Sequence, residues 1–142
     1  QLALARQNIE AAELTSRIAC HSVDLLQAQS LPGEADLWWM SQFLDCFSQE
    51  QIVAILRLIR RSMKPGARVA ILELFWDRQP FAAASFSLNA TSLYFTALAN
   101  GNSRFYSAQV LLDCLAQAGF VLEQEINNIG RGHTLLIAAS CT

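Results

Sequence analysis

Charge is scarce in this sequence. Asp, Glu, Lys and Arg together make up 15% of its 142 residues, whereas 53% are hydrophobic. An average globular domain carries roughly 25% charged residues, so we expect that a partner covers part of this surface or that part of the domain is missing. The formal net charge is −2, which argues against a nucleic-acid-binding protein, since such a surface needs an excess of Lys and Arg.

Only one basic cluster occurs, formed by Arg57, Arg60, Arg61 and Lys64. It falls at the end of a predicted helix. Cationic side chains there complement the negative end of the helix dipole. We therefore interpret this cluster as a contribution to helix stability and not as a binding site.

Histidine is nearly absent, and the four cysteines form no Cys-x-x-Cys pair. With only His21 and His133 available, the spacing of a zinc site is missing, and we expect no metal. No run approaches the roughly 18 apolar residues of a membrane span, and no secretory signal is recognisable. These features predict a cytoplasmic protein with reduced thiols.

Apolar residues recur at alternating helical and strand spacings, which predicts an α/β fold. Ser48, with Gln51 three residues later, resembles a capping box at a helix start. The strand at 68–74 is continuously apolar, as in parallel sheets that are covered on both faces. The predicted helices cover residues 2–14, 48–63, 82–99 and 107–118, and the predicted strands cover 17–23, 35–40, 68–74, 120–127 and 133–139.

Three acidic residues follow successive predicted strands: Asp24, Asp45 and Glu73. Ligands of doubly wound sheets bind at the carboxyl ends of the strands. An acid at one strand end is often only a helix cap, but three in succession indicate a common pocket. We therefore take these three as the first candidates for a functional site.

Several segments resemble one enzyme family. Residues 44–48, Leu-Asp-Cys-Phe-Ser, stand where that family has Leu-His-Asp-Trp-Ser, and residues 64–68, Lys-Pro-Gly-Ala-Arg, match a Lys-Pro-Gly-Gly-Arg turn. The likeness continues through Asn-Gly-Asn-Ser-Arg at 100–104 and Ala-Gly-Phe at 118–120. The chain thus resembles the plant and bacterial phenolic O-methyltransferases, S-adenosylmethionine-dependent enzymes related to acetylserotonin and caffeate methyltransferases.

The resemblance implies a Rossmann-like class I methyltransferase sheet, mostly parallel, with a C-terminal antiparallel hairpin. Residues 1–142 would be the C-terminal portion of a single catalytic domain that lacks its first two strands. Gln1 opens inside a predicted helix, in agreement with a truncated start. The glycine-rich cofactor loop would then lie upstream, the fragment alone would be inactive, and the intact protein would be a homodimer that binds S-adenosylmethionine and a small-molecule acceptor.

The resemblance also implies a cofactor site. Asp24 falls where the family recognises the adenine amino group, and a carboxylate suits that donor. Ser41 stands where a cofactor-contacting Lys is usual. Leu25 and Met40, which lie next to these two positions, complete the expected cofactor-binding set.

For catalysis, the resemblance places Asp45 where the family has its catalytic His, and Glu73 where a Glu orients that His. The separation, 73 − 45 = 28, agrees with the family pattern. A free Asp has a pKa near 3.9 and a phenol one near 10, so Asp45 would serve as a base only if burial or Glu73 raised its pKa. The alternative base is His133, although a His after a glycine turn is more often structural.

On the acceptor side, Asn100 falls near a substrate-contacting Asn of the family, and Ser103 stands where a second catalytic Glu is expected. Trp76 and Tyr94 follow the strand that ends in Glu73, and they suggest an apolar, aromatic acceptor. Two alternatives stay open because a His is replaced by Asp45. One is a relative that performs decarboxylation or hydroxylation, and the other is a non-catalytic, protein-binding member.

Overall fold

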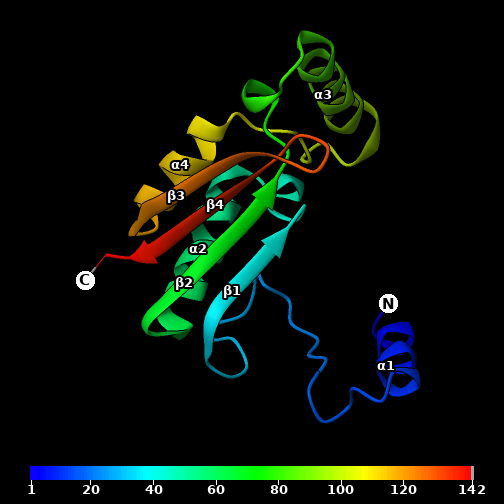
Figure 1. Ribbon diagram of the computed structural model, residues 1–142, viewed down its shortest axis with the longest axis vertical. Coiled ribbons are helices and arrows are strands. Elements are labelled where there is room, and N and C mark those ends of the chain that lie inside the picture. The colour runs from blue at the N-terminus through cyan, green and yellow to red at the C-terminus, as the bar shows by residue number, and fades with distance from the viewer. Residues whose placement is uncertain (142) are drawn as a thin grey trace.

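Four strands form one sheet in the order β1-β2-β4-β3 (Figure 1). The computed structural model of the protein describes residues 1–141. The strands β1 (Ala35–Ser41) and β2 (Met63–Glu73) are parallel, and β4 (His133–Ser140) runs antiparallel both to β2 and to β3 (Phe120–Ile129). This mixed sheet, which closes with the β3–β4 hairpin, confirms the predicted α/β fold class.

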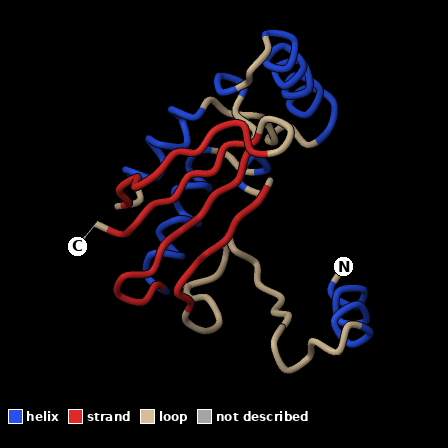
Figure 2. Tube along the Cα trace, in the orientation of Figure 1, coloured by secondary structure: helices blue, strands red, loops and turns tan. Residues whose placement is uncertain are grey.

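Two amphipathic helices cover one face of the sheet (Figure 2). They are α2 (Gln49–Ser62) and α4 (Ala108–Gln117), and they pack against each other and against the strands. The largest fully buried side chains come from α2, α4 and the two central strands: Ile52, Ile55, Leu56, Leu58, Val69, Ile71, Leu111, Leu115, Thr134 and Leu136, with Leu44 and Phe75 from the loops. This single core is what positions the carboxyl ends of β1 and β2.

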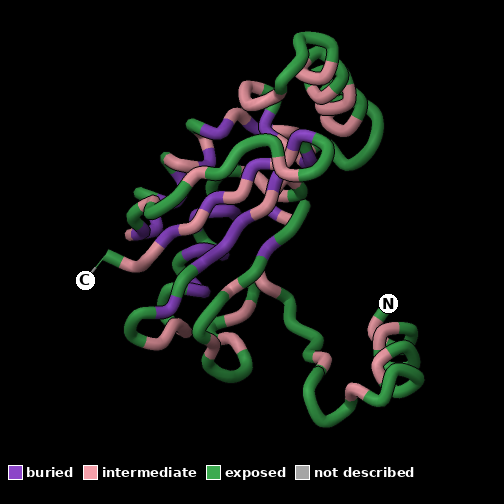
Figure 3. The backbone as a smooth tube through the Cα atoms, viewed as in Figure 1, coloured by how far each residue is buried: buried purple, intermediate pink, exposed green. Residues whose placement is uncertain are grey.

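The opposite face of the sheet is more open. Leu37 and Trp39 of β1 are 54% and 55% exposed, whereas Met40 on the covered face is buried. The expectation that helices cover both faces is therefore met on one face only within residues 1–141. Figure 3 shows buried residues along β2, β4 and α2, whereas much of β1 and β3 is exposed.

The remaining helices lie beyond the sheet. Helices α1 (Leu2–Ala11) and α3 (Ala82–Tyr94) contain no buried residue, and α3 continues into a π-helical turn, η3 (Phe95–Ala99). Two short 3-10 helices, η1 (Leu44–Cys46) and η2 (Trp76–Arg78), follow β1 and β2. In Figure 1, α3 projects past the carboxyl ends of β1 and β2, and α1 stands apart on the N-terminal segment.

One predicted strand is wrong. Residues 17–23 form irregular backbone and not a strand, and α1 ends at Ala11 and not near residue 14. A strand is stable only when a neighbour satisfies its backbone N–H and C=O groups. Within residues 1–141, β1 pairs with β2 alone, so no strand of this sheet lies beside residues 17–23 to complete such a ladder.

The predicted turn at Lys64-Pro65-Gly66 is absorbed into β2. Helix α2 ends at Ser62, and the β1–β2 register jumps from Ala35–Met63 to Leu37–Arg68. Two steps along β1 thus correspond to five along β2, so the intervening residues bulge out of the ladder. Pro65 has no N–H to donate, and Gly66 has a φ of +79°, which explains the bulge at this position.

The capping box at Ser48 is present as predicted. The Ser48 hydroxyl accepts from the Gln51 backbone N–H at 3.3 Å, and the Gln51 side chain accepts from the Ser48 N–H at 3.0 Å. We expect Ser48→Ala to lower the free energy of unfolding by about 1 kcal/mol, the usual cost of a lost cap. Urea denaturation measures this, with the exposed loop substitution Ser22→Ala as control. Equal stability of the two variants would contradict the assignment.

Within residues 1–141, no helix is both long enough and apolar enough to span a membrane. Over the same residues, no cluster of three or more His, Cys, Asp or Glu side chains has the arrangement of a metal site.

Candidate active site

Glu73, the last residue of β2, is a buried carboxylate that holds the next segment of the chain in place. It is 3% exposed, and its Oε1 accepts hydrogen bonds from the backbone N–H groups of Phe43 at 2.8 Å and Leu44 at 2.9 Å. These two amides open the turn η1, which carries Asp45. The parallel pairing of β1 and β2 makes this possible, because it brings both strand ends to one edge.

The other oxygen of Glu73, Oε2, is buried and has no hydrogen-bond partner within residues 1–141. Burial, with a smaller contribution from the charge of Asp45, raises the pKa of Glu73 to about 7, despite the lowering effect of hydrogen bonds from backbone amides. The pKa of Glu73 therefore lies close to neutral pH. A carboxyl group that exchanges a proton in this range is suited to acid–base chemistry.

Asp45 is partly buried in η1, and burial raises its pKa, although a weak hydrogen bond from the Cys46 thiol at 3.5 Å opposes the shift. The backbone carbonyl of Asp45 accepts from the Arg104 N–H at 2.9 Å. Asp45 is thus held from two sides, through its carbonyl by residue 104 and through the preceding amides by Glu73. Of the two causes named from the sequence, burial raises the pKa of Asp45, and Glu73 is not among the causes.

The loop at 100–104 brings two further predicted residues to η1. Asn100 Oδ1 accepts from the N–H groups of Asn102 and Ser103, and Asn100 Nδ2 donates to Ser103 Oγ at 2.7 Å. Ser103 is 7% exposed. Asn102 donates to the Gln51 side chain at 3.0 Å, which fastens the loop to the start of α2.

Cys46 lies among these groups, and sequence reasoning missed it as a site residue. Burial raises the pKa of its thiol, the Asp45 carboxylate and Glu73 raise it further, and Ser103 lowers it as a hydrogen-bond partner. Asp45, Glu73 and Ser103 therefore all influence the pKa of the Cys46 thiol. The structure thus gathers the predicted catalytic pair, Asp45 and Glu73, with the predicted substrate residues Asn100 and Ser103.

His133, the alternative base, is the first residue of β4 and lies at the same edge, because the next residue, Thr134, pairs with Glu73. Its imidazole Nε2 is in hydrogen-bond contact with the side-chain amide nitrogen of Gln42. Gln42 itself has a φ of +46° and was not predicted.

Trp76 and Tyr94, the other two predicted substrate residues, lie outside this cluster. They are 38% and 55% exposed, and Tyr94 packs edge-on against Phe95. Within residues 1–141, neither the Trp76 nor the Tyr94 side chain forms a hydrogen bond with Asp45 or Glu73.

Three of the four predicted cofactor residues, Leu25, Met40 and Ser41, surround one apolar pocket of about 460 Å³. Its other walls are Leu31, Trp38, Trp39, Phe43, Ile55 and Ile59. The fourth, Asp24, is exposed and accepts from the Leu26 N–H at 3.0 Å. The Trp38 indole N–H is buried and unpartnered within the described residues. The apolar walls of this pocket, with Asp24 next to the lining residue Leu25 in the sequence, fit adenine, which is a flat base with an exocyclic amine.

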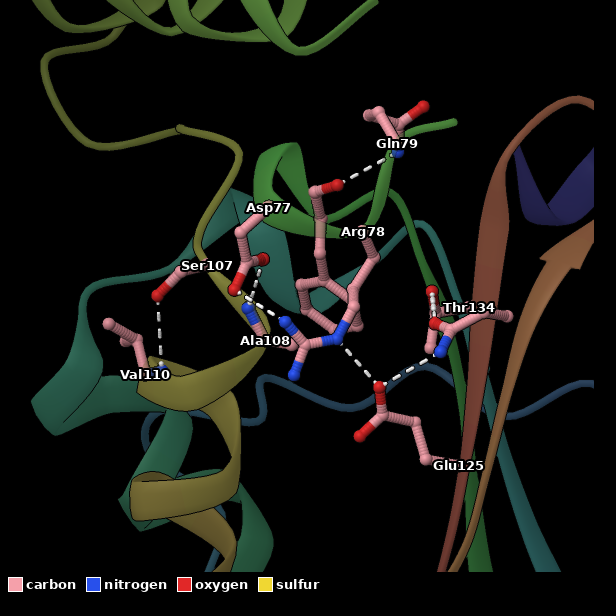
Figure 4. Close-up of polar contacts among 10 residues, drawn as sticks. Asp77, Arg78, Gln79, Ser107, Ala108, Val110, Glu125 and Thr134 are labelled. Carbon is pink, nitrogen blue, oxygen red and sulfur yellow. Dashed lines mark hydrogen bonds and ion pairs between the residues drawn. The ribbon is translucent and has the colours of Figure 1, made fainter. Parts of the chain in front are cut away.

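A polar network behind the site also escaped sequence reasoning (Figure 4). Arg78 of η2 donates to Glu125 of β3 at 2.7 Å and to Asp77 at 2.8 Å, and Asp77 accepts from the Ala108 N–H at the start of α4 at 2.8 Å. Arg78 and Glu125 are 47 residues apart, so no local pattern could have paired them. The network ties the segment that follows Glu73 to the hairpin and to α4.

Glu73 and Asp45 lie at the carboxyl ends of the parallel strands of a mixed α/β sheet, which is where Rossmann-like domains bind their ligands. Over residues 2–121 the sequence matches the O-methyltransferase domain family. The chain belongs to that family.

Its relatives are much longer than the chain. A protein of Dictyostelium discoideum named "Probable inactive O-methyltransferase 11" is 38% identical over 53 residues, which are 37% of this chain and 16% of that protein. The S-adenosylmethionine-dependent methyltransferase SibL, solved in its apo form, is 25% identical with a TM-score of 0.81, covering 99% of this chain and 41% of that one.

The O-methyltransferase NcsB1 from neocarzinostatin biosynthesis was solved with S-adenosyl-L-homocysteine and 1,4-dihydroxy-2-naphthoic acid. It is 17% identical with a TM-score of 0.78, covering 97% of this chain and 38% of that one. At this identity the likeness shows the fold. The chain spans about 40% of the length of these two solved structures.

Proposed function

We propose that the full-length protein transfers a methyl group from S-adenosylmethionine to a hydroxyl group of an apolar, aromatic small molecule. In this proposal Asp45 is the base, and Glu73 is the residue that positions it. One observation carries the assignment: in a member of the O-methyltransferase domain family, Glu73 Oε1 binds the two backbone amides that directly precede Asp45.

When bound, S-adenosylmethionine would supply a methyl group already activated on a sulfonium. The protein then has two tasks, which are to align the acceptor oxygen and to remove its proton. Asp45 would take that proton on a carboxylate oxygen. Burial favours this because it raises the pKa of Asp45. Alignment and a general base are both large effects, worth several kcal/mol and roughly 10²–10⁴-fold in rate respectively.

The cofactor would occupy the pocket around Leu25, Met40 and Ser41, with Asp24 as acceptor for the adenine amine. Support comes from the apolar walls of that pocket and from two structural neighbours, SibL, which is S-adenosylmethionine-dependent, and NcsB1, which was solved with S-adenosyl-L-homocysteine. The chain thus contributes one wall of the proposed site.

The acceptor would approach Asp45 from the side of Asn100 and Ser103, with Trp76 and Tyr94 forming the outer, apolar part of its site. The contact of Ser103 with Cys46 supports the inner part. The aromatic diol bound to NcsB1 supports the chemical class. We also propose that residues 1–142 are one portion of a single catalytic domain, and that the intact protein is a cytoplasmic homodimer.

A second candidate function is a non-catalytic member of the family. Two observations favour it: Asp45 occupies the position of the expected His, and the similar Dictyostelium protein is named inactive. A decarboxylase-like or hydroxylase-like reaction at the same site is a third possibility, which the replacement of that His also raises.

The deciding experiment incubates the full-length protein with methyl-labelled S-adenosylmethionine and a panel of phenols, naphthols and hydroxyquinones, and follows labelled products by mass spectrometry. Calorimetry with S-adenosyl-L-homocysteine runs alongside. Methyl transfer to any acceptor supports the proposal. Saturable binding without transfer would support the non-catalytic reading, and a product without the label would support the third.

A further inference from the structure

One polar cavity lies away from the proposed active site. It has a volume of about 530 Å³ and is lined by Arg57, Arg60 and Arg61 of α2, by residues 116–119 at the end of α4, and by Ser140 of β4. Helix α2 ends where β2 begins, whereas Glu73 is the last residue of β2. Ser140 lies one residue beyond the Arg68–Ala139 pair, about six strand residues from Glu73, so the two sites are on the order of 20 Å apart.

The three arginines of this cavity have no acidic partner in the described structure. The ion pairs formed within residues 1–141 involve Lys64, Arg68 and Arg78 instead. Arg60 and Arg61 do lie in the last turn of α2, as the helix-dipole interpretation expects. That interpretation accounts for their position, but it does not explain why three guanidinium groups converge on one cavity.

Two of these arginines are held in place by neutral groups. Arg57 Nη2 donates to the Gln117 carbonyl at 3.1 Å, and Arg60 donates from Nε to Ser140 Oγ and from Nη2 to the Cys141 carbonyl, both at 3.1 Å. Each guanidinium has five N–H donors, so most of the donors are not used by these bonds. Arg57 and Arg60 are thus held in place, and no acidic side chain of the described residues neutralises them.

Gly119 makes room for Arg60. It has a φ of +84°, and a Cβ at this position would lie 2.8 Å from Arg60 Nη1. A side chain at residue 119 would therefore displace the Arg60 guanidinium. Gly119 thus leaves the space that Arg60 occupies. Pre-placed guanidinium groups lose less entropy when they bind an oxyanion, and they bind phosphate through paired, charge-assisted hydrogen bonds.

We propose that this cavity binds the phosphate groups of a small phosphorylated molecule. Arg57 and Arg61 are one helical turn apart, about 6 Å along the axis, which suits two linked phosphates better than one. No aromatic side chain lines the cavity, so a nucleobase would find no stacking partner. The ligand class is thus a diphosphate recognised by its phosphates, whatever group they carry.

The test is calorimetric titration of the full-length protein with pyrophosphate, ADP and CDP at constant ionic strength. We expect saturable binding, with similar affinity for all three ligands and unchanged by added S-adenosyl-L-homocysteine. The site stands independently of the proposed methyl transfer, so its result does not depend on that activity.

Two variants and a control locate the site. Arg61→Gln removes a side chain without a protein hydrogen bond in the described structure, and Arg57→Gln/Arg61→Gln removes two charges. We expect each to weaken pyrophosphate binding at least about tenfold, the effect of losing one charge-assisted contact. The melting temperature of the ligand-free Arg61→Gln protein should fall by no more than a few degrees, the effect of losing one helix-dipole interaction. Arg131→Gln, in the β3–β4 turn, should bind as the wild type does.

Three results would overturn the proposal. The first is the absence of saturable pyrophosphate binding, and the second is equal affinity in Arg61→Gln and wild type. The third is tighter binding of a short poly-glutamate peptide than of pyrophosphate, which would identify the cavity as a docking site for an acidic protein segment.

Discussion

Asp45→Asn should reduce kcat of methyl transfer by roughly 10²–10⁴-fold, with a much smaller change in KM, if Asp45 accepts the hydroxyl proton. Asparagine has nearly the same shape but cannot take up a proton. The substitution keeps the backbone bond from Arg104 to the residue-45 carbonyl, so the turn η1 should stay in place. Steady-state kinetics on the full-length protein, with the acceptor found in the panel assay, gives both constants.

The matched control is Asp36→Asn at the start of β1. Asp36 has a side chain that is 92% exposed, and it forms only a 3.6 Å contact with Lys64. We expect its kcat to equal that of the wild type. A loss of less than about tenfold in Asp45→Asn would remove Asp45 as the general base, and His133→Gln would then be the next variant to assay.

Glu73→Gln should make the protein less sensitive to alkaline pH. The pKa of Glu73 is raised from 4.5 to about 7 in the folded state, chiefly by burial. A carboxyl group with a raised folded-state pKa contributes stability that is fully present below pH 4.5 and is lost as pH rises through 7. A shift of this size corresponds to about 3 kcal/mol. Glutamine stays neutral, and its Oε1 can still accept from the Phe43 and Leu44 amides.

Urea denaturation between pH 5 and 8.5 measures this effect. We expect the wild type to lose about 2.5 kcal/mol more unfolding free energy than Glu73→Gln across this range, because a small part of the effect already falls below pH 5. The exposed loop variant Glu34→Gln should follow the wild type. Parallel pH curves for wild type and Glu73→Gln would show that the pKa of Glu73 is not raised in the folded protein.

Features that depend on local pattern were predictable from the sequence. The apolar periodicity around Ile52 and Ile55, the capping box at Ser48, and the continuous apolar run of β2 identified the central α/β unit. The glycine turn at 130–132 identified the hairpin. The motif at residues 44–48 indicated the family, and the match over residues 2–121 confirmed it. These features need only near neighbours, so one stretch of sequence is enough to reveal them.

Features that depend on a partner distant in sequence were not predictable. Residues 17–23 have strand-like composition but no neighbouring strand to pair with, so they stay irregular. The ion pair between Arg78 and Glu125 joins segments 47 residues apart. In the sequence, the basic cluster that begins at Arg57 is interpreted as complementing the helix dipole, and only the packing of α2 against α4 places its three arginines around one cavity.

The sequence by itself determined the family, the sheet-and-helix order and the identity of the two acids, because short-range apolar spacing and motif residues encode them. Only the tertiary structure determined the environment of Asp45 and Glu73. It buries Glu73, turns it toward the amides that precede Asp45, and raises the pKa of both carboxyl groups. Desolvation and the distance between charges depend on how the chain packs. The spacing of residues along the sequence therefore does not determine how large these effects are.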